Sequence, residues 1–188
     1  FEGSVLGRLS GRQSVSVADP KQLPSGVDVL SGELDLQIGS LRPWAAWVPA
    51  GWRLHGQVNG RADVAGTLAS PQYKGVINGQ NLQLAHALMG VNLTEGQLQL
   101  DLQGDHAHLA NLTAKGGAQG GFIKVTGDAV LGSAPQASLE VQAERFALLQ
   151  RIDRRLVISG QAKALLTEAD IQFNGKVGVD EGLFDFSR

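Results

Sequence analysis

The sequence has no cysteine, few aromatic residues and no long apolar run, and each shortage excludes a class of protein. The absence of cysteine excludes disulfide scaffolds, thiol catalysis and thiolate metal sites. No segment approaches the roughly 18 consecutive apolar residues that a membrane-spanning helix needs. The formal net charge of -2 gives no electrostatic basis for binding nucleic acid. We therefore expect no nucleic-acid partner.

Glycine is abundant, with 25 among 188 residues. The glycines show no three-residue period, which excludes collagen, and they interrupt apolar alternation, which excludes a flexible linker. The first residues, Phe1 to Ser4, do not form a signal peptide, and the chain lacks an initiator methionine. We interpret residues 1–188 as one elongated domain that is a processed or excised part of a larger protein.

Apolar and polar residues alternate along most of the chain. Leu34, Leu36 and Ile38 alternate with acidic and amide residues, and the same period of two recurs in segment after segment up to 171–179. Successive side chains of a strand point to opposite faces, so this pattern predicts antiparallel strands with one apolar face. Turn signals such as Ser70-Pro71 and Glu95-Gly96 separate the segments. About a dozen strands are expected.

Two short segments have helical spacing. Leu41, Trp44, Ala45 and Val48 fall three or four residues apart, which predicts a helix over 41–48 with Ser40 as its N-cap. Phe146 and Leu149 are three apart, and we predict a second short helical turn over 145–151.

The composition favours one curved sheet over a packed sandwich. Aromatic residues make up 5% of the chain, whereas sandwich cores are usually filled by aromatics distributed over the strands. An open sheet of about a dozen strands tends to curl, split into layers or close. We predict an all-β fold: a long curled, mainly antiparallel sheet that forms an open groove or half-pipe with an apolar concave face, plus one or two short helices.

The apolar strand positions are the candidate site residues, as contacts for a lipid or for another strand. Their alternative role is ordinary core burial against a second sheet. The predicted groove-lining residues are Leu34, Leu36, Ile38, Val58, Val64, Leu82, Leu84, Leu98, Leu100, Leu102, Ile123, Val125, Leu139, Val141, Ile158, Ile171, Phe173 and Val177.

No catalytic constellation is present in the sequence, and we predict a protein that is not an enzyme and takes no metal or cofactor. His106 and His108 could supply half a metal site from one strand face, but no further ligand residues are nearby. Two histidines that are simply exposed to solvent are the commoner explanation of this spacing. The arginine cluster Arg145, Arg151, Arg154 and Arg155 could contact anionic head groups or a partner, although a solvated loop explains it as well.

The order of the strand motifs resembles the TamB family. The motifs are LHGQVNGRADVAGTLASP at 54–71, GVI at 75–77, LQL at 82–84, GVNL at 90–93, GQLQL at 96–100, VTGDA at 125–129, ISGQA at 158–162 and GKVGVDEG at 175–182. Each motif is weak alone, and their order over residues 30–188 carries the resemblance. The predicted helix followed by GWRL at 51–54 is also similar to related chains.

The resemblance implies a location and a function. TamB-like proteins, the inner-membrane subunits of the translocation and assembly module, are anchored in the inner membrane of Gram-negative bacteria by an N-terminal helix and span the periplasm. They belong with AsmA-like and bridge-type lipid-transfer proteins, and their C-terminal end works with the outer-membrane barrel TamA. The expected role is outer-membrane biogenesis, through transport of phospholipid or other amphipathic cargo or through assembly of autotransporters and other outer-membrane proteins. The expected partners are phospholipid, TamA and unfolded outer-membrane protein strands.

Two other classes of function remain open. A structural β-stack or adhesin-like scaffold would dock a partner without carrying lipid, although such stacks tend to have a stricter repeat length. An enzyme or sugar-binding sandwich would need a pocket with clustered aromatics, for which Trp44, Trp47 and Trp52 are the only candidates.

Overall fold

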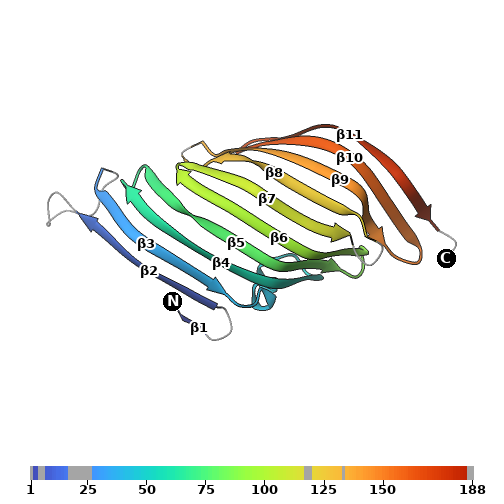
Figure 1. Cartoon of the computed structure of the whole chain (residues 1–188), viewed down its shortest axis with the longest axis horizontal. Coiled ribbons are helices and arrows are strands. Elements are labelled where there is room, and N and C mark those ends of the chain that lie inside the picture. The colour runs from blue at the N-terminus through green and yellow to red at the C-terminus, as the bar shows by residue number, and fades with distance from the viewer. Residues whose placement is uncertain (1, 4–6, 17–26, 117–119, 133, 186–188) are drawn as a thin grey trace.

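The computed structural model describes residues 2–3, 7–16, 27–116, 120–132 and 134–185. These residues form one open sheet of eleven strands (Figure 1). The elements are β1 Glu2–Gly3, β2 Gly7–Ser16, β3 Val29–Ile38, the 3-10 helix η1 Arg42–Trp47, β4 Trp52–Gly66, β5 Pro71–His86, β6 Val91–Gly104, β7 His106–Gly116, β8 Phe122–Val130, β9 Gln136–Gln150, β10 Arg154–Thr167 and β11 Ile171–Phe184.

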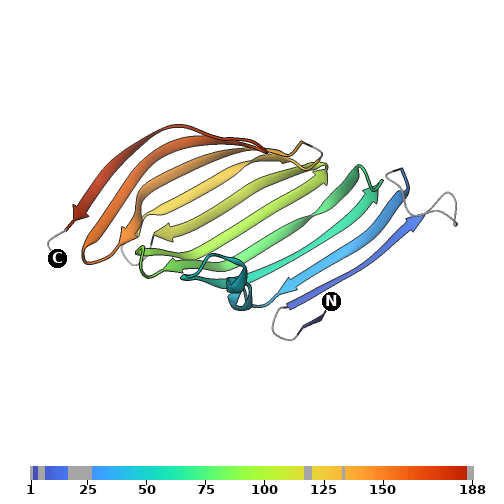
Figure 2. The same cartoon turned by 180° about the vertical axis from the view of Figure 1, so that it is seen from behind.

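Each strand pairs antiparallel with the strands before and after it in the chain, so the order in the sheet is the order in the sequence (Figure 2). The predicted all-β fold and its antiparallel pairing are confirmed. Short turns favour this arrangement, because a strand that reverses within a few residues has only its predecessor within reach. The Asn-Gly pairs at 59–60 and 174–175, a sequence common in hairpin turns, lie inside β4 and β11.

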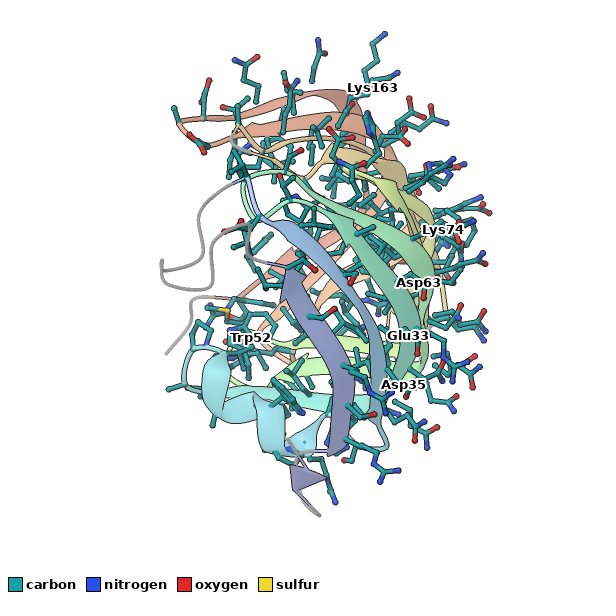
Figure 3. All side chains as sticks on the ribbon, turned by 90° about the vertical axis from the view of Figure 1, so that its left-hand side faces the viewer. Glu33, Asp35, Trp52, Asp63, Lys74 and Lys163 are labelled. Carbon is teal, nitrogen blue, oxygen red and sulfur yellow. The ribbon has the colours of Figure 1, made fainter. Side chains whose placement is uncertain are left out.

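The sheet is curved, and its convex side carries Glu33, Asp35, Asp63, Lys74 and Lys163 (Figure 3). Several bulges accompany the curvature, and three of them lie at non-glycine residues with positive φ. Asn81, Glu95 and Arg145 have positive φ angles of 51°, 52° and 43°, and the strand registers shift beside them. A bulge bends its strand and increases the local twist.

The two predicted helices have different outcomes. The segment expected at 41–48 is a 3-10 helix of six residues, Arg42–Trp47, with proline in its first turn. The N-cap residue is Leu41 and not the predicted Ser40, although the Ser40 hydroxyl accepts a hydrogen bond from the Arg42 N–H at 3.3 Å. The prediction of a helical turn over 145–151 is wrong, because this segment continues β9 as far as Gln150. Ala147 pairs there with Val157 of β10, and this cross-strand pairing overrides the local spacing.

Deep burial is limited to a few apolar side chains, because a single layer has no second sheet to cover it. The buried apolar residues among those described are Ile38, Ala62, Val64, Ala107, Phe146, Ala147, Val157 and Ala164. Phe146 is the largest, with 2% of its surface exposed. It lies in the last part of β9, where that strand extends past the end of β7. Among the described residues, no helix has the length and apolarity to cross a membrane.

Candidate functional site

The face opposite the convex charges is defined by strand register. Lys74, on the convex side, pairs with Gln103 (Figure 3), and cross-strand partners share a face. Leu102, Leu100 and Leu98 alternate with Gln103 and therefore point to the concave side. In the same way Lys163 pairs with Asn174 of β11, so the apolar residues that alternate with Asn174 also point to the concave side.

Register joins these positions into rows that run across the strands. One row passes from Leu36 through Gly60, Ile77, Leu100, Leu109, Gly127, Leu139 and Ala164 to Phe173. A neighbouring row passes from Ile38 through Val58, Gly79, Leu98, Leu112, Val125, Val141 and Ala162 to Gly175. Each row continues from β3 to β11 without a charged residue.

By register and by alternation along each strand, the eighteen predicted residues fall on the concave side, while their contact with a lipid or with another strand stays a prediction. They lie on β3 (Leu34, Leu36, Ile38), β4 (Val58, Val64), β5 (Leu82, Leu84), β6 (Leu98, Leu100, Leu102), β8 (Ile123, Val125), β9 (Leu139, Val141), β10 (Ile158) and β11 (Ile171, Phe173, Val177). Leu82 follows a bulge, and its side chain lies over Gly79: a Cβ built at Gly79 would be 2.9 Å from Leu82 Cδ1.

Most of these side chains are half-buried. Only Ile38 and Val64 of the set are buried. The three on β11 are the most open, with exposed fractions of 58% for Ile171, 75% for Phe173 and 58% for Val177. The described residues form no second sheet that covers this face, so packing between two layers does not account for the pattern.

Sequence reasoning missed several residues that share these rows, among them Ile77, Leu109 and Leu112. Ile77 follows Val76, which is itself apolar and points to the convex side, so strict alternation is lost there. Leu109 and Leu112 are three residues apart, because the register with β6 shifts between Gln99 and Leu100. A period-two search breaks at such a bulge, and only the pairing partner restores the phase.

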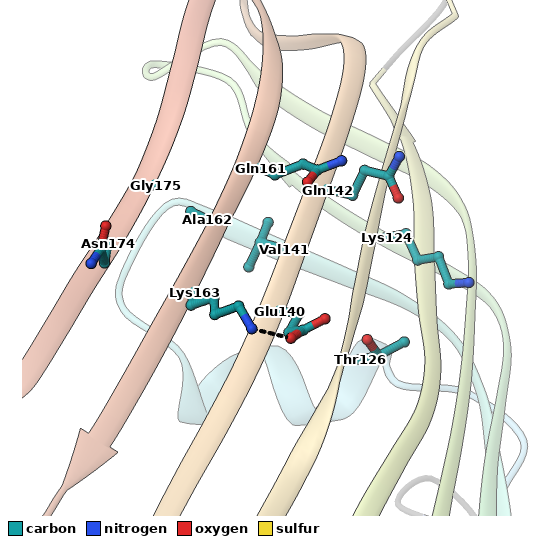
Figure 4. A pocket seen from close by; sticks show the side chains of 10 residues that line it. All are labelled: Lys124, Thr126, Glu140, Val141, Gln142, Gln161, Ala162, Lys163, Asn174 and Gly175. Atoms are coloured by element: carbon teal, nitrogen blue, oxygen red, sulfur yellow. Dashed lines mark hydrogen bonds and ion pairs between the residues drawn. The ribbon is translucent and has the colours of Figure 1, made fainter.

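The convex face is polar and holds shallow hollows. One of them, near β9 and β10, has a volume of about 660 Å³ and is lined by Lys124, Gln142, Gln161 and the Lys163–Glu140 pair (Figure 4). Lys163 Nζ lies 2.6 Å from Glu140 Oε1, and this hydrogen bond raises the pKa of Lys163 above its ordinary value. Both side chains are solvent-exposed, so the pair contributes little to stability.

The two histidines singled out in the sequence each lie beside an aspartate. His106 Nδ1 is 2.6 Å from Asp105, and His108 Nδ1 is 2.7 Å from Asp128. Within the described part of the chain, no group of three or more His, Asp or Glu residues is arranged to hold a metal ion.

The predicted arginine cluster is a set of ion pairs around two carboxylates. Arg151 Nε and Arg154 Nε lie 2.8 Å and 3.2 Å from Asp153, while Arg145 and Arg155 lie 2.7 Å and 2.8 Å from Glu181. The hydrogen bond from Arg151 is the main cause that lowers the pKa of Asp153; desolvation opposes it, and Arg154 adds to it. The Asp153 pairs lie in the turn between β9 and β10, whereas the Glu181 pairs link β9 and β10 to β11.

The aromatic candidates for a sugar pocket do not form one that the structure describes. Trp52 is half-buried and packs edge-on against His86, with ring centroids 5.0 Å apart. His86 is 6% exposed, and its Nδ1 accepts the Met89 N–H at 3.1 Å. Trp44 is half-buried in η1, and the side chain of Trp47 lies outside the described residues.

No family model matches the chain, and no curated protein or solved structure matches it. The resemblance to the TamB family therefore depends on the order of the sequence motifs alone.

Proposed function

We propose that this chain is a non-enzymatic, groove-forming segment of a TamB-like periplasmic protein that shields phospholipid acyl chains between the inner and outer membranes. The observation that carries the proposal is the pair of uncharged rows from β3 to β11, most of whose side chains stay partly exposed on the concave side of a single-layer sheet. In this proposal the concave face is an apolar groove, and its open side is the route by which cargo enters.

The energetics of acyl transfer favour such a surface. Covering one methylene is worth about 0.8 kcal/mol, so a chain of about 16 carbons gains about 12 kcal/mol when it is fully shielded. A carrier across water therefore needs continuous apolar contact rather than a specific polar pocket. The nine strands from β3 to β11, spaced about 4.8 Å apart, give a track about 40 Å long.

The wider context of the proposal comes from the resemblance. The parent protein would be anchored in the inner membrane by a helix outside this chain, and its C-terminal region would work with the barrel protein TamA. The polar convex face suits an aqueous compartment such as the periplasm, because its charged pairs are exposed to solvent, as the 73% and 61% exposed side chains of Lys163 and Glu140 illustrate.

The test compares two faces of one strand. A photo-reactive residue is placed at Leu98 or Leu100, and in the matched control at Gln99 between them. Native mass spectrometry with lipid extraction then identifies co-purifying phospholipid, and irradiation identifies what each position contacts. We expect phospholipid crosslinks from the two leucine positions and none from Gln99. Absence of lipid, with leucine crosslinks only inside the protein, would contradict the proposal.

A second candidate cargo is an unfolded outer-membrane β-strand, and the exposed edge of β11 favours it. β11 pairs with β10 on one side, and all but one of its side chains are exposed. An extended segment could add to this edge by backbone hydrogen bonds. Crosslinks from β11 to a peptide with alternating apolar residues, but not from the convex position Gln99, would support this cargo. A scaffold without any cargo would give neither crosslink.

A further inference from the structure

Two loops far apart in the sequence are fastened together at one edge of the sheet. Residues 87–90 connect β5 to β6, and residues 151–153 connect β9 to β10. The Gln150 N–H donates to the Gly90 carbonyl at 2.7 Å, and the Arg151 guanidinium donates to the Leu88 carbonyl at 2.6 Å. The edge formed by these loops and η1 is called the η1 rim below, and the strand ends on the other side form the opposite rim.

The fastened loops hold large apolar side chains in solvent. Ile152 is 99% exposed, Leu88 is 74% exposed and Met89 is 51% exposed. Arg151 packs against Gly90, where a Cβ would be 2.6 Å from Arg151 Cγ, so the pair of loops is braced by side-chain packing as well as by hydrogen bonds. Neighbouring exposed apolar residues held in place in this way mark an interaction surface.

The charges of the two rims differ. Arg42, Arg53, Arg151 and Arg154 lie on the η1 rim together with two acidic residues: Asp153, between the last two arginines, and Asp185, whose N–H donates to the Asp153 carbonyl at 2.8 Å. On the opposite rim the described loop residues 67–70, 105, 131–132, 134–135 and 168–170 include Asp105, Glu168 and Asp170, and among these residues there is no lysine or arginine. Arginines beside projecting apolar side chains suit a surface that is anionic outside and apolar beneath.

We propose that the η1 rim docks on an anionic membrane surface, with Leu88, Met89 and Ile152 entering the interfacial layer and the arginines contacting lipid phosphates. Projecting loop tips fit a deformable lipid surface better than a protein interface, whose buried core is closely packed on both sides. The proposal goes beyond the shielding function, since docking needs the rim alone and not an occupied groove. If both hold, docking brings the open side of the groove to the lipids it would take up.

The test is co-sedimentation of the 188-residue chain with vesicles. One vesicle preparation contains phosphatidylcholine with phosphatidylglycerol, and the other contains phosphatidylcholine alone. The rim variant carries Leu88→Ser, Met89→Ser and Ile152→Ser. The matched control carries Val27→Ser and Leu68→Ser on the opposite rim, where Val27 is 80% exposed and Leu68 is 40% exposed. Circular dichroism verifies that both variants keep their strand content.

We expect the wild-type chain to bind the anionic vesicles and to bind the neutral ones more weakly. The rim variant should lose about tenfold or more in partitioning, and the control should lose none. The proposal is overturned if the wild-type chain ignores anionic vesicles, if the rim variant binds like the wild type, or if the control falls equally. If the wild-type chain binds neither kind of vesicle, the exposed apolar loops would instead be a surface for a protein partner.

A groove variant separates this proposal from the shielding function. Leu98→Asp places a charge on the concave side of β6, near the middle of the strand Val91–Gly104 and away from its η1-rim end. We expect it to lose co-purifying lipid in native mass spectrometry while it still binds anionic vesicles. The rim variant should behave in the opposite way, keeping co-purified lipid. Loss of vesicle binding in Leu98→Asp would show that binding runs through the groove, which overturns the rim proposal alone.

Discussion

Phe146 lies against the backbone of Gly116, at the point where β9 passes beyond the end of β7. A Cβ built on Gly116 would be 3.1 Å from Phe146 Cδ2 and 2.6 Å from the Ala147 backbone nitrogen. Gln150 Nε2 also donates to the Gly116 carbonyl at 2.8 Å. Two backbones approach each other closely here, and the largest buried side chain among the described residues lies beside them. This part of the sheet therefore resembles a packed core.

Gly116→Ala should therefore destabilise the chain. The backbone atom at 2.6 Å cannot move without shifting β9, and overpacking of this kind costs about 1–3 kcal/mol. Urea unfolding followed by circular dichroism measures the change. Gly39→Ala is the matched control, because nothing lies within 4 Å of its added Cβ. Equal midpoints for the two variants would show that β9 does not press on Gly116.

Phe146→Ala should cost more than any other removal of a phenylalanine. Its side chain is 2% exposed, and truncating a buried phenylalanine costs about 3–5 kcal/mol. Phe173→Ala makes the same chemical change on β11, where the side chain is 75% exposed, and should cost less than about 1 kcal/mol. Thermal unfolding of both variants tests the difference. Similar costs would mean that Phe173 is covered in solution.

The sequence predicted the sheet well because the strand signal is local. Alternation alone predicts which side of the sheet Leu98, Gln99 and Leu100 point to. Short turns then leave each strand with one possible neighbour on each side. The concave set assembled from alternation accordingly falls on one face. What local reasoning could not supply was the phase across bulges, so Leu109 and Leu112 were missed.

The helical turn expected at 145–151 failed for a different reason. The spacing of Phe146 and Leu149 suits a helix, but Phe146 pairs with Ile158 and Leu149 with Leu156 in the sheet. That pairing depends on residues that follow in the chain and on the bulge at Arg145. The η1 rim could not be predicted from the sequence for the same reason, since the loops that carry Leu88 and Ile152 are joined only by hydrogen bonds between residues far apart in the chain.

The hydrogen bond from the Arg151 guanidinium to the Leu88 carbonyl, called the clasp below, should persist at mildly acidic pH. Arg151 first, and Arg154 after it, lower the pKa of Asp153 below the ordinary aspartate value of 3.8. A lowered pKa gives a contribution that is present above the ordinary value and is lost only as the pH falls through the lowered one. The NMR shift of the Leu88 carbonyl carbon should thus stay constant from about pH 7 to about pH 5.

Asp153→Asn is the companion experiment. It removes the carboxylate that holds Arg151 and Arg154, so the Leu88 carbonyl shift should change at neutral pH and lose any acid transition. Because the η1 rim then carries one more uncompensated positive charge, binding to anionic vesicles should rise at low salt. A wild-type shift that titrates above the ordinary aspartate value would refute the role of Asp153 in the clasp.

The edge of β11 should make the isolated chain self-associate. Its concave-side residues Ile171, Phe173 and Val177 are more than half exposed, and an unprotected edge pairs readily with another chain. An inward-pointing charge is one way in which natural sheets block such pairing, so Val177→Lys should lower the weight-average mass at high concentration in sedimentation velocity. Asn174→Lys adds the same charge to the convex side of the same strand and should lower it less. If both variants and the wild type sediment as monomers at every concentration, the edge of β11 is protected, and the case for strand addition as a second cargo mode loses its structural basis.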